Sequence, residues 1–244
     1  MMAIKISNLR KEYKDVVAVD NLNLEIKENE LFSLLGVNGA GKTTTIKMLS
    51  TLVKPTSGDA VIFGNSIISD EEKVKKLIDI SMQETAIARK LTVEENIEFY
   101  AKLSGQTKEE TEVSKKYVYD NFGLDTVAKK QAAKLSGGVQ RKLSIALALV
   151  SKPKILFLDE PTLGLDVIAR RELWNTVKKL KSKMTIILTT HYMEEAEFLS
   201  DRIGIMKNGK LLFVGTKEEL FLKTDKNNVE EAFIEIVSGG EINA

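Results

Sequence analysis

Cysteine is absent from the 244-residue sequence, which excludes disulfide bonds and thiolate metal sites and is typical of a reducing compartment. Long apolar runs are absent too. The longest covers residues 145–150, far short of the roughly 20 residues that a membrane-spanning helix needs. Residues 1–13 alternate charged and apolar side chains and lack the apolar centre of a signal peptide. We therefore expect a cytoplasmic protein that reaches a membrane only through a partner.

An excess of charge of one sign is also missing. The 36 basic and 35 acidic residues give a net charge of +1. Balanced charge produces no strong field to attract nucleic acid or anionic lipid, so we expect no nucleic-acid partner. The length suits one large domain, or one domain that carries an insertion.

The apolar pattern of the first sixty residues predicts strands. Residues 4–9 and 22–26 alternate apolar and polar side chains, as half-buried antiparallel strands do. Residues 31–35 form a continuous apolar run, which is typical of a buried central strand. A helix is expected over residues 42–52.

The middle of the chain, residues 84–134, is predicted to be a helical subdomain inserted into an α/β core. Thr92 with Glu95, and Thr107 with Glu110, have the spacing of a capping box at a helix start. Residues 93, 97, 100 and 104, with 99 and 103 beside them, form a helical stripe. We interpret this stripe as core packing, and the alternative is a face that docks a partner.

The α/β pattern returns after residue 135. Asn208-Gly209 lies between two apolar segments and predicts a tight hairpin. Thr216 with Glu219 predicts a short helix start. The remaining predicted elements are helices over 136–150, 167–180 and 229–237, and strands over 155–158 and 184–188.

A phosphate-binding loop is the leading motif. Gly36-Val37-Asn38-Gly39-Ala40-Gly41-Lys42-Thr43, followed by Thr44, stands between a predicted buried strand and a predicted helix. The glycines allow backbone N–H groups and the helix N-terminus to point at phosphates. Lys42 would place its charge at the β and γ oxygens of ATP, and the Thr43 hydroxyl can ligate Mg²⁺.

Two carboxylates end the predicted strand over residues 155–158. Asp159 would support the Mg²⁺ ion, and Glu160 is the candidate general base for the water that attacks the γ-phosphate. Alone, such a pair is more often a solvated strand end, and the phosphate-binding loop makes the catalytic interpretation the stronger one.

A second small-residue segment, Leu135-Ser136-Gly137-Gly138-Val139-Gln140, opens another helix just before this acidic strand. Its backbone N–H groups and hydroxyl suit an anion. With this order of motifs the sequence resembles the ATP-binding cassette (ABC) family of nucleotide-binding domains, whose signature is Leu-Ser-Gly-Gly-x-Gln. The resemblance covers about residues 4–214 and implies a P-loop NTPase core with an antiparallel β subdomain.

The resemblance implies further site residues. Tyr13 fits the aromatic residue that stacks on adenine, and Gln83 fits the glutamine that contacts Mg²⁺ and communicates with the permease. Asp166 matches the loop that crosses to the other subunit, although Leu163 stands where serine is common. His191, the only histidine, fits the residue that contacts the γ-phosphate. Catalytic roles are thus expected for Lys42, Glu160 and His191.

The family arrangement also implies partners. Two chains would pack head to tail, so that each ATP lies between Lys42 of one chain and Ser136 of the other. The second chain is a copy of this one or a paralogous ATPase. Both would bind an integral membrane permease at the inner face of the cell membrane. In this map, residues 1–83 and 135–220 form a RecA-like core with the β region, and residues 221–244 a short C-terminal tail.

Three functions remain open at this point. The favoured one is an ATPase subunit that powers a membrane transporter, and the others are soluble ABC ATPases that act on DNA or on ribosomes. Residues 49–58, 189–197 and 229–237 resemble bacterial exporters of the drug-resistance and sodium-efflux type, with an importer as the alternative. The cargo would be chosen by the permease.

Overall fold

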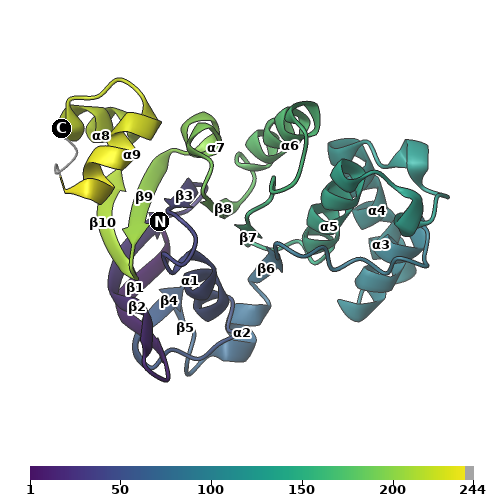
Figure 1. Ribbon diagram of the computed structural model, residues 1–244. Coiled ribbons are helices and arrows are strands. Elements are labelled where there is room, and N and C mark those ends of the chain that lie inside the picture. Colours follow the sequence, from purple (N-terminus) through teal and green to yellow (C-terminus); the bar gives the residue numbers. More distant parts are fainter. Residues whose placement is uncertain (240–244) are drawn as a thin grey trace.

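The protein was analysed as a computed structural model, which describes residues 1–239. Two sheets organise the chain (Figure 1). The first has the order β2-β1-β4-β5 and is antiparallel throughout. Its strands are β1 (Met2–Tyr13), β2 (Val16–Lys27), β4 (Ser57–Ile62) and β5 (Asn65–Ser66). The expected antiparallel strands near the N-terminus are present.

The second sheet has the order β10-β9-β3-β8-β7-β6, and β3, β6, β7, β8 and β9 run parallel. Its strands are β3 (Leu31–Leu35), β6 (Ile78–Ser81), β7 (Ile155–Asp159), β8 (Thr185–Thr190), β9 (Arg202–Lys207) and β10 (Lys210–Gly215). The carboxyl ends of parallel strands meet at one edge of the sheet. The segments that follow β3, β6, β7 and β8 are therefore brought together there.

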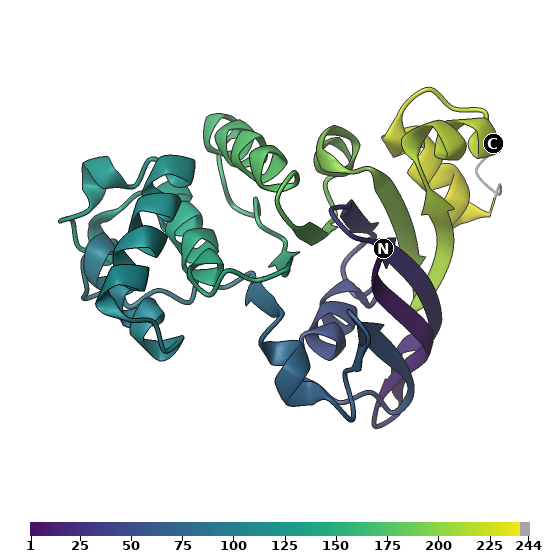
Figure 2. The ribbon, with the colours of Figure 1, turned by 180° about the vertical axis from the view of Figure 1, so that it is seen from behind.

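Nine α-helices occur among the described residues. They are α1 (Lys42–Leu49), α2 (Glu71–Lys75), α3 (Val93–Leu103), α4 (Lys108–Phe122), α5 (Gly137–Val150), α6 (Val167–Leu180), α7 (Met193–Leu199), α8 (Lys217–Thr224) and α9 (Val229–Ser238). The group α3, α4 and α5 lies at one end of the molecule, and α8 and α9 lie at the other (Figure 1 and Figure 2).

Alternating side chains of the parallel sheet fill two separate cores. Ile155 and Phe157 of β7 pack in the cluster shared with α1 and the antiparallel sheet. Leu156 and Leu158 pack in the cluster shared with α3, α4, α5 and α6. Because both faces are covered, the central strands are continuously apolar, as parallel strands usually are.

The helix starts follow their local sequence. Thr92 and Thr107 form complete capping boxes with Glu95 and Glu110, and Thr216 forms a third with Glu219. The hairpin between β9 and β10 turns through Asn208 and Gly209, which have φ values of 49° and 77°. Both positive angles match the tight turn that an Asn-Gly pair favours.

Three expectations need correction. The helix expected over residues 42–52 ends at Leu49, because Thr51 adopts a left-handed φ of 61°. The strand expected over residues 184–188 runs from Thr185 to Thr190. The stripe on α3 is core only in part, since Phe99 is 46% and Leu103 68% exposed while Val93 and Ile97 are buried.

The position of α5 bears on the predicted subdomain limits. This helix packs against α3 and α4 on one side and against β6 and β7 on the other. It therefore joins the helical group to the parallel sheet. The segment predicted as a tail, residues 221–244, includes the second half of α8 and all of α9, which pack on β9 and β10. Residues 240–244 of that segment lie outside the described residues.

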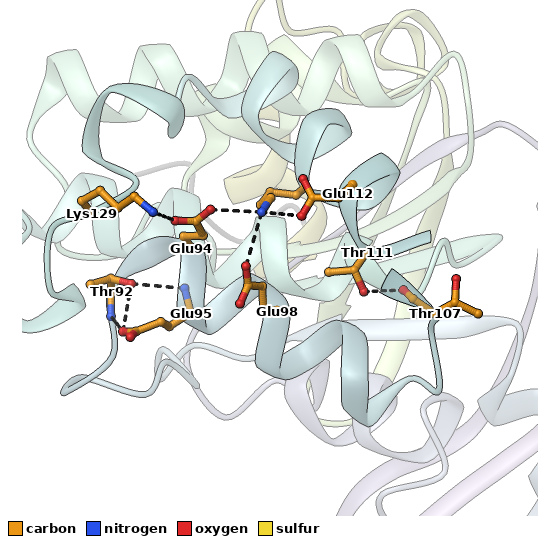
Figure 3. Close-up of polar contacts among 9 residues, drawn as sticks. Thr92, Glu94, Glu95, Glu98, Thr107, Thr111, Glu112 and Lys129 are labelled. Carbon is orange, nitrogen blue, oxygen red and sulfur yellow. Dashed lines mark hydrogen bonds and ion pairs between the residues drawn. The ribbon is translucent and has the colours of Figure 1, made fainter. Parts of the chain in front are cut away.

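An ion-pair network ties α3 to α4 (Figure 3). The ammonium of Lys115 lies 3.0 Å from a Glu94 oxygen, 3.3 Å from Glu98 and 2.6 Å from Glu112. Lys129 also pairs with Glu94. The hydrogen bond to Glu112 contributes most to raising the pKa of Lys115. This cation therefore stays charged and holds the helical pair together, well away from the strand ends.

Candidate active site

A cavity of about 690 Å³ opens where the glycine loop and the ends of β7 and β8 meet. Most of the predicted site residues line it, namely Tyr13, Asn38, Gly39, Ala40, Gly41, Lys42, Thr43, Thr44, Gln83, Glu160 and His191. Five residues that the sequence did not single out for binding also line it, namely Val16, Val17, Ala18, Leu163 and Asn208. Residues from six separate segments thus share one concave surface.

The glycine loop bends where only glycine fits. Gly41 has a φ of 105°, and a Cβ at this position would lie 2.4 Å from the carbonyl oxygen of Ala18. The following helix, α1, begins at Lys42 and has no side chain that caps its N-terminus. Its first backbone N–H groups remain available, and they carry the positive end of the helix dipole. The loop can therefore bind an anion.

Lys42 places a buried charge in this cavity. Its side chain is 5% exposed, and its Nζ donates to the carbonyl oxygen of Gly36 at 2.6 Å. The same ammonium lies 3.3 Å from Oε1 of Glu160, which is 7% exposed. The other Glu160 oxygen contacts Nδ1 of His191. A lysine, a carboxylate and an imidazole thus form one connected group, and the Gly36 carbonyl accepts a hydrogen bond from its lysine.

Asp159 supplies a carboxylate at the end of β7. Its Oδ1 accepts hydrogen bonds from the Thr43 hydroxyl at 3.0 Å and the Thr189 hydroxyl at 2.5 Å. Its Oδ2 is buried and has no hydrogen-bond partner among residues 1–239. Thr43, Gln83 and Asp159 also border a second cavity, of about 540 Å³. These oxygen donors and the unpartnered carboxylate oxygen fit Mg²⁺, which prefers such ligands.

Tyr13 also lines the cavity. Its ring is 44% exposed, and the Lys11 ammonium lies 4.9 Å from the ring centroid. Val16, Val17 and Ala18 lie on the same stretch of the cavity wall. An exposed aromatic face among small apolar side chains suits a planar base, with a stacking contribution of about 1–3 kcal/mol.

The signature segment, residues 135–140, and Asp166 do not line the large cavity. Among the described residues that line the large cavity, none belongs to the segment 135–140. Ser136 caps α5 by accepting from Val139 N at 3.4 Å, and the Gln140 amide donates to Leu135 O at 2.9 Å. Gly137 and Gly138 form the first turn of α5. Asp166 caps α6 through the N–H groups of the second and third residues after it, each at 2.9 Å.

Two buried charged residues near the site carried no sequence signal that identified them. Arg141 is 4% exposed and Glu195 fully buried. Oε1 of Glu195 accepts from the Thr162 hydroxyl and from the Trp174 indole N–H, both at 2.9 Å. These contacts join α7, which follows His191, to α6 and to the segment after Glu160. Burial raises the pKa of Glu195.

Comparison with known proteins agrees with this geometry. The family model for ABC transporters matches residues 19–163, more than half of the chain. Linearmycin resistance ATP-binding protein LnrL of Bacillus subtilis (strain 168) is 39% identical over 240 residues, which cover 95% of this chain and 77% of that protein. The chain belongs to the ABC transporter family, as one of its ATP-binding domains.

The other relatives are longer. Phospholipid-transporting ATPase ABCA3 of Homo sapiens is 44% identical over 90% of this chain, but this chain spans only 13% of its length. A solved ATP-binding subunit of an ABC transporter superposes with a TM-score of 0.85 at 26% identity, covering 96% of this chain and 99% of that one. The fold prediction is confirmed. Among residues 1–239, no helix is both long and apolar enough to cross a membrane.

Glu195→Gln should change how stability depends on pH. The folded state raises the pKa of Glu195 above its ordinary value of 4.5, so the native protein binds this proton more tightly than the unfolded chain does. Wild-type stability should therefore fall as pH rises from 4.5 to the raised pKa. The amide keeps a carbonyl acceptor for Thr162 and Trp174 and carries no charge. Across this window, the free energy of unfolding of the variant should rise relative to that of wild type. Above the raised pKa, the difference between the two should stay constant.

Urea unfolding at a series of pH values measures this difference. Glu194→Gln, at the exposed neighbouring position, is the matched control and should follow wild type. If the free energies of unfolding of Glu195→Gln and wild type differ by the same amount at every pH, the raised pKa of Glu195 is wrong.

Proposed function

We propose that the chain binds MgATP in the large cavity and hydrolyses it to ADP and phosphate, and that this hydrolysis powers a membrane transporter. The observation that carries the proposal is the buried Lys42 ammonium at the base of the glycine loop, 3.3 Å from the Glu160 carboxylate. A γ-phosphate offers the ammonium a stronger anionic partner than one carboxylate does. A solved ATP-binding cassette with 29% identity and a TM-score of 0.78 is a dimer bound to ADP and Pi, which supports nucleotide binding.

Each side chain has a defined task in this mechanism. Lys42 and the loop N–H groups bind the phosphates, and Tyr13 stacks on the base. When Lys42 turns to phosphate, the Glu160 carboxylate is free to take a proton from the attacking water. His191 contacts Glu160 and holds the γ-phosphate and water in line. Mg²⁺, held through Thr43, Gln83 and Asp159, would neutralise phosphate charge.

The separation of the signature from the cavity supports sites shared between two chains. Ser136 opens α5 and offers its hydroxyl and the backbone of Gly137, yet the cavity that contains Lys42 is lined by other residues. Two chains packed head to tail bring each signature to the partner's nucleotide. Beside Asp166, the apolar residues Val167 and Ile168 are 78% and 74% exposed, which suits burial in such an interface.

The transporter partner is proposed to dock beside the Gln83 segment. This segment is tied to α3, because the Tyr100 hydroxyl donates to the Ala86 carbonyl at 2.6 Å. On the same helix, Phe99 and Leu103 stay exposed. An apolar surface coupled to the metal-binding segment suits a cytoplasmic helix of a permease. The resistance and phospholipid-transporting relatives favour export over import. They also favour transport over action on DNA or ribosomes.

Glu160→Gln should retain MgATP binding and lose turnover, because the amide is nearly the same size but is a poor base. We expect a fall in kcat on the order of 10²–10⁴. Steady-state phosphate release and calorimetric MgATP binding separate the two effects. Glu172→Gln, a partly exposed carboxylate on α6, is the control. A Glu160→Gln enzyme that hydrolyses ATP near the wild-type rate would remove Glu160 from the role of base.

Mixed dimers test whether the sites are shared. Lys42→Ala removes the positive charge that binds the phosphates, and Ser136→Arg blocks the signature, so each homodimer should be inactive. In a mixed dimer, one site collects both changes and the other is intact. Random pairing makes half the dimers mixed, so about a quarter of wild-type ATPase activity should return under two-fold symmetry. Tagged pull-down confirms that mixed dimers form.

Cooperativity between sites could suppress this recovery, so a second measurement decides. Cysteines introduced at Ala40 and Gly137 should form an ATP-dependent crosslink between chains. If neither the crosslink nor the recovery of activity is observed, each chain has a self-contained site and the shared arrangement is wrong.

Phe99→Glu should weaken docking to the permease without changing the ATPase activity of the isolated subunit. A charge placed on the exposed apolar face opposes burial against an apolar partner. Affinity purification from detergent-solubilised membranes measures the integral membrane protein that is retained. Val113→Glu, on the exposed face of α4, is the matched control and should retain it. Equal retention by both variants would place the docking surface elsewhere. Purification with ribosomes or DNA instead of a membrane protein would overturn the transporter assignment.

A further inference from the structure

Arg141 is a buried cation whose hydrogen bonds go to the backbone of two functional segments. It lies in the second turn of α5, five residues after Ser136, and is 4% exposed. Its Nε donates to Pro161 O at 2.8 Å, and its Nη2 donates to Asp159 O at 2.9 Å. Its Nη1 donates to the carbonyl oxygens of Met82 and Gln83. One side chain thus holds the end of β7 and the Gln83 segment together.

Carbonyl groups are the hydrogen-bond partners of this guanidinium. Burying a cation is costly unless hydrogen bonds compensate, and here burial lowers the pKa of Arg141 to about 10. The planar guanidinium has its donors in a fixed fork. That fork binds carbonyls on two segments. Met82 and Gln83 are 58 or more residues from Arg141 in the sequence, and Asp159 and Pro161 are 18 to 20 residues from it. A lysine has a single head group and cannot reproduce this pattern.

The backbone between two of these carbonyls is strained. Glu160 lies between Asp159 and Pro161 and has a φ of 49°, in the left-handed region. For a residue with a side chain this conformation costs about 1–2 kcal/mol. Arg141 binds the carbonyl on each side of it, and the N–H of Glu160 donates to Thr189 O at 3.1 Å. The strained turn is therefore fixed from both sides, and it directs the Glu160 carboxylate to Lys42 and His191.

We propose that Arg141 is a positioning residue, which holds Glu160 in the left-handed conformation that aims its carboxylate into the cavity and fixes the Gln83 segment to the same helix. This inference rests on the proposed ATPase function. Arg141 does not itself line the cavity, so it acts through Glu160 and Gln83. Its loss should slow the chemical step and leave nucleotide binding largely intact.

The same contacts link the two proposed sites of a dimer. Ser136 caps the start of α5, and in the shared arrangement it faces the partner's nucleotide. Arg141 is about 7.5 Å further along the helix, at 1.5 Å per residue. A shift of α5 on binding the partner's nucleotide would therefore pass through Arg141 to Asp159 and Pro161, the residues on either side of Glu160 in the same chain. Each chain would sense one nucleotide with its signature and adjust the base for the other.

Arg141→Lys and Arg141→Gln test the proposal by separating kcat from KM. A misplacement of the base by about 1 Å can cost about 10²-fold in rate, so kcat for ATP should fall by about that factor. KM and the calorimetric affinity for MgATP should change little, because Arg141 contacts neither Lys42 nor the glycine loop and binds Asp159 and Gln83 through their backbone carbonyls only. Lys115→Met is the control: it removes another buried cation from its network, so it should lower the melting temperature while kcat stays at the wild-type value.

The Glu160→Gln background provides a readout that a purely structural role would not move. If Arg141 acts through Glu160, Arg141→Lys should add little to the loss already caused by Glu160→Gln, whereas independent effects would multiply. Wild-type kcat in both folded Arg141 variants, or fully multiplicative losses, would overturn the proposal. So would failure of both variants to fold, because that outcome makes the role structural. Wild-type protein without MgATP hydrolysis would instead overturn the proposed function itself.

Discussion

The contact between the Lys42 ammonium and the Glu160 carboxylate is the interaction on which the site depends. The two groups are 3.3 Å apart and less than a tenth exposed. Burying both charges costs several kcal/mol each, and the pairing offsets this cost only with good geometry and further hydrogen bonds. Gly36 O supplies one for the lysine, and His191 contacts the carboxylate. Removing either partner would leave an uncompensated buried charge. Of the two charges, the Lys42 ammonium is the one that an incoming phosphate can pair with in place of Glu160.

The fold can be understood as the framework for that contact. Lys42 follows β3, Glu160 follows β7 and His191 follows β8, and the order β3-β8-β7 in a parallel sheet places all three at one edge. The glycine loop turns the chain from β3 into α1, and the close approach of Ala18 O to Gly41 leaves no room for a Cβ. The antiparallel sheet then adds Tyr13 to the lining of the cavity.

Local sequence predicted much of this arrangement. The capping boxes and the Asn-Gly hairpin are short-range signals, and α6 has the expected bounds because Asp166 caps its first turn. The glycine loop and the acidic strand end are likewise contiguous motifs. Long-range contacts gave no such signal. Arg141 meets Gln83 from 58 residues away, and Glu195 meets Thr162 from 33 residues away. A single sequence contains no pattern that pairs them, and the exposed side of α3 depends on which neighbours cover it.

The central claim is that each ATP lies between the glycine loop of one chain and the signature of another. The most direct measurement is a structure of the Glu160→Gln variant with MgATP, determined by crystallography or electron cryomicroscopy. The account predicts a two-fold dimer with two nucleotides. In each site, Lys42 of one chain would have turned from residue 160 to the phosphates, and Ser136 of the partner chain would contact the γ-phosphate. Nucleotide bound at Lys42 with both Ser136 hydroxyls facing solvent, or a γ-phosphate contacted by Ser136 of the same chain, would contradict it.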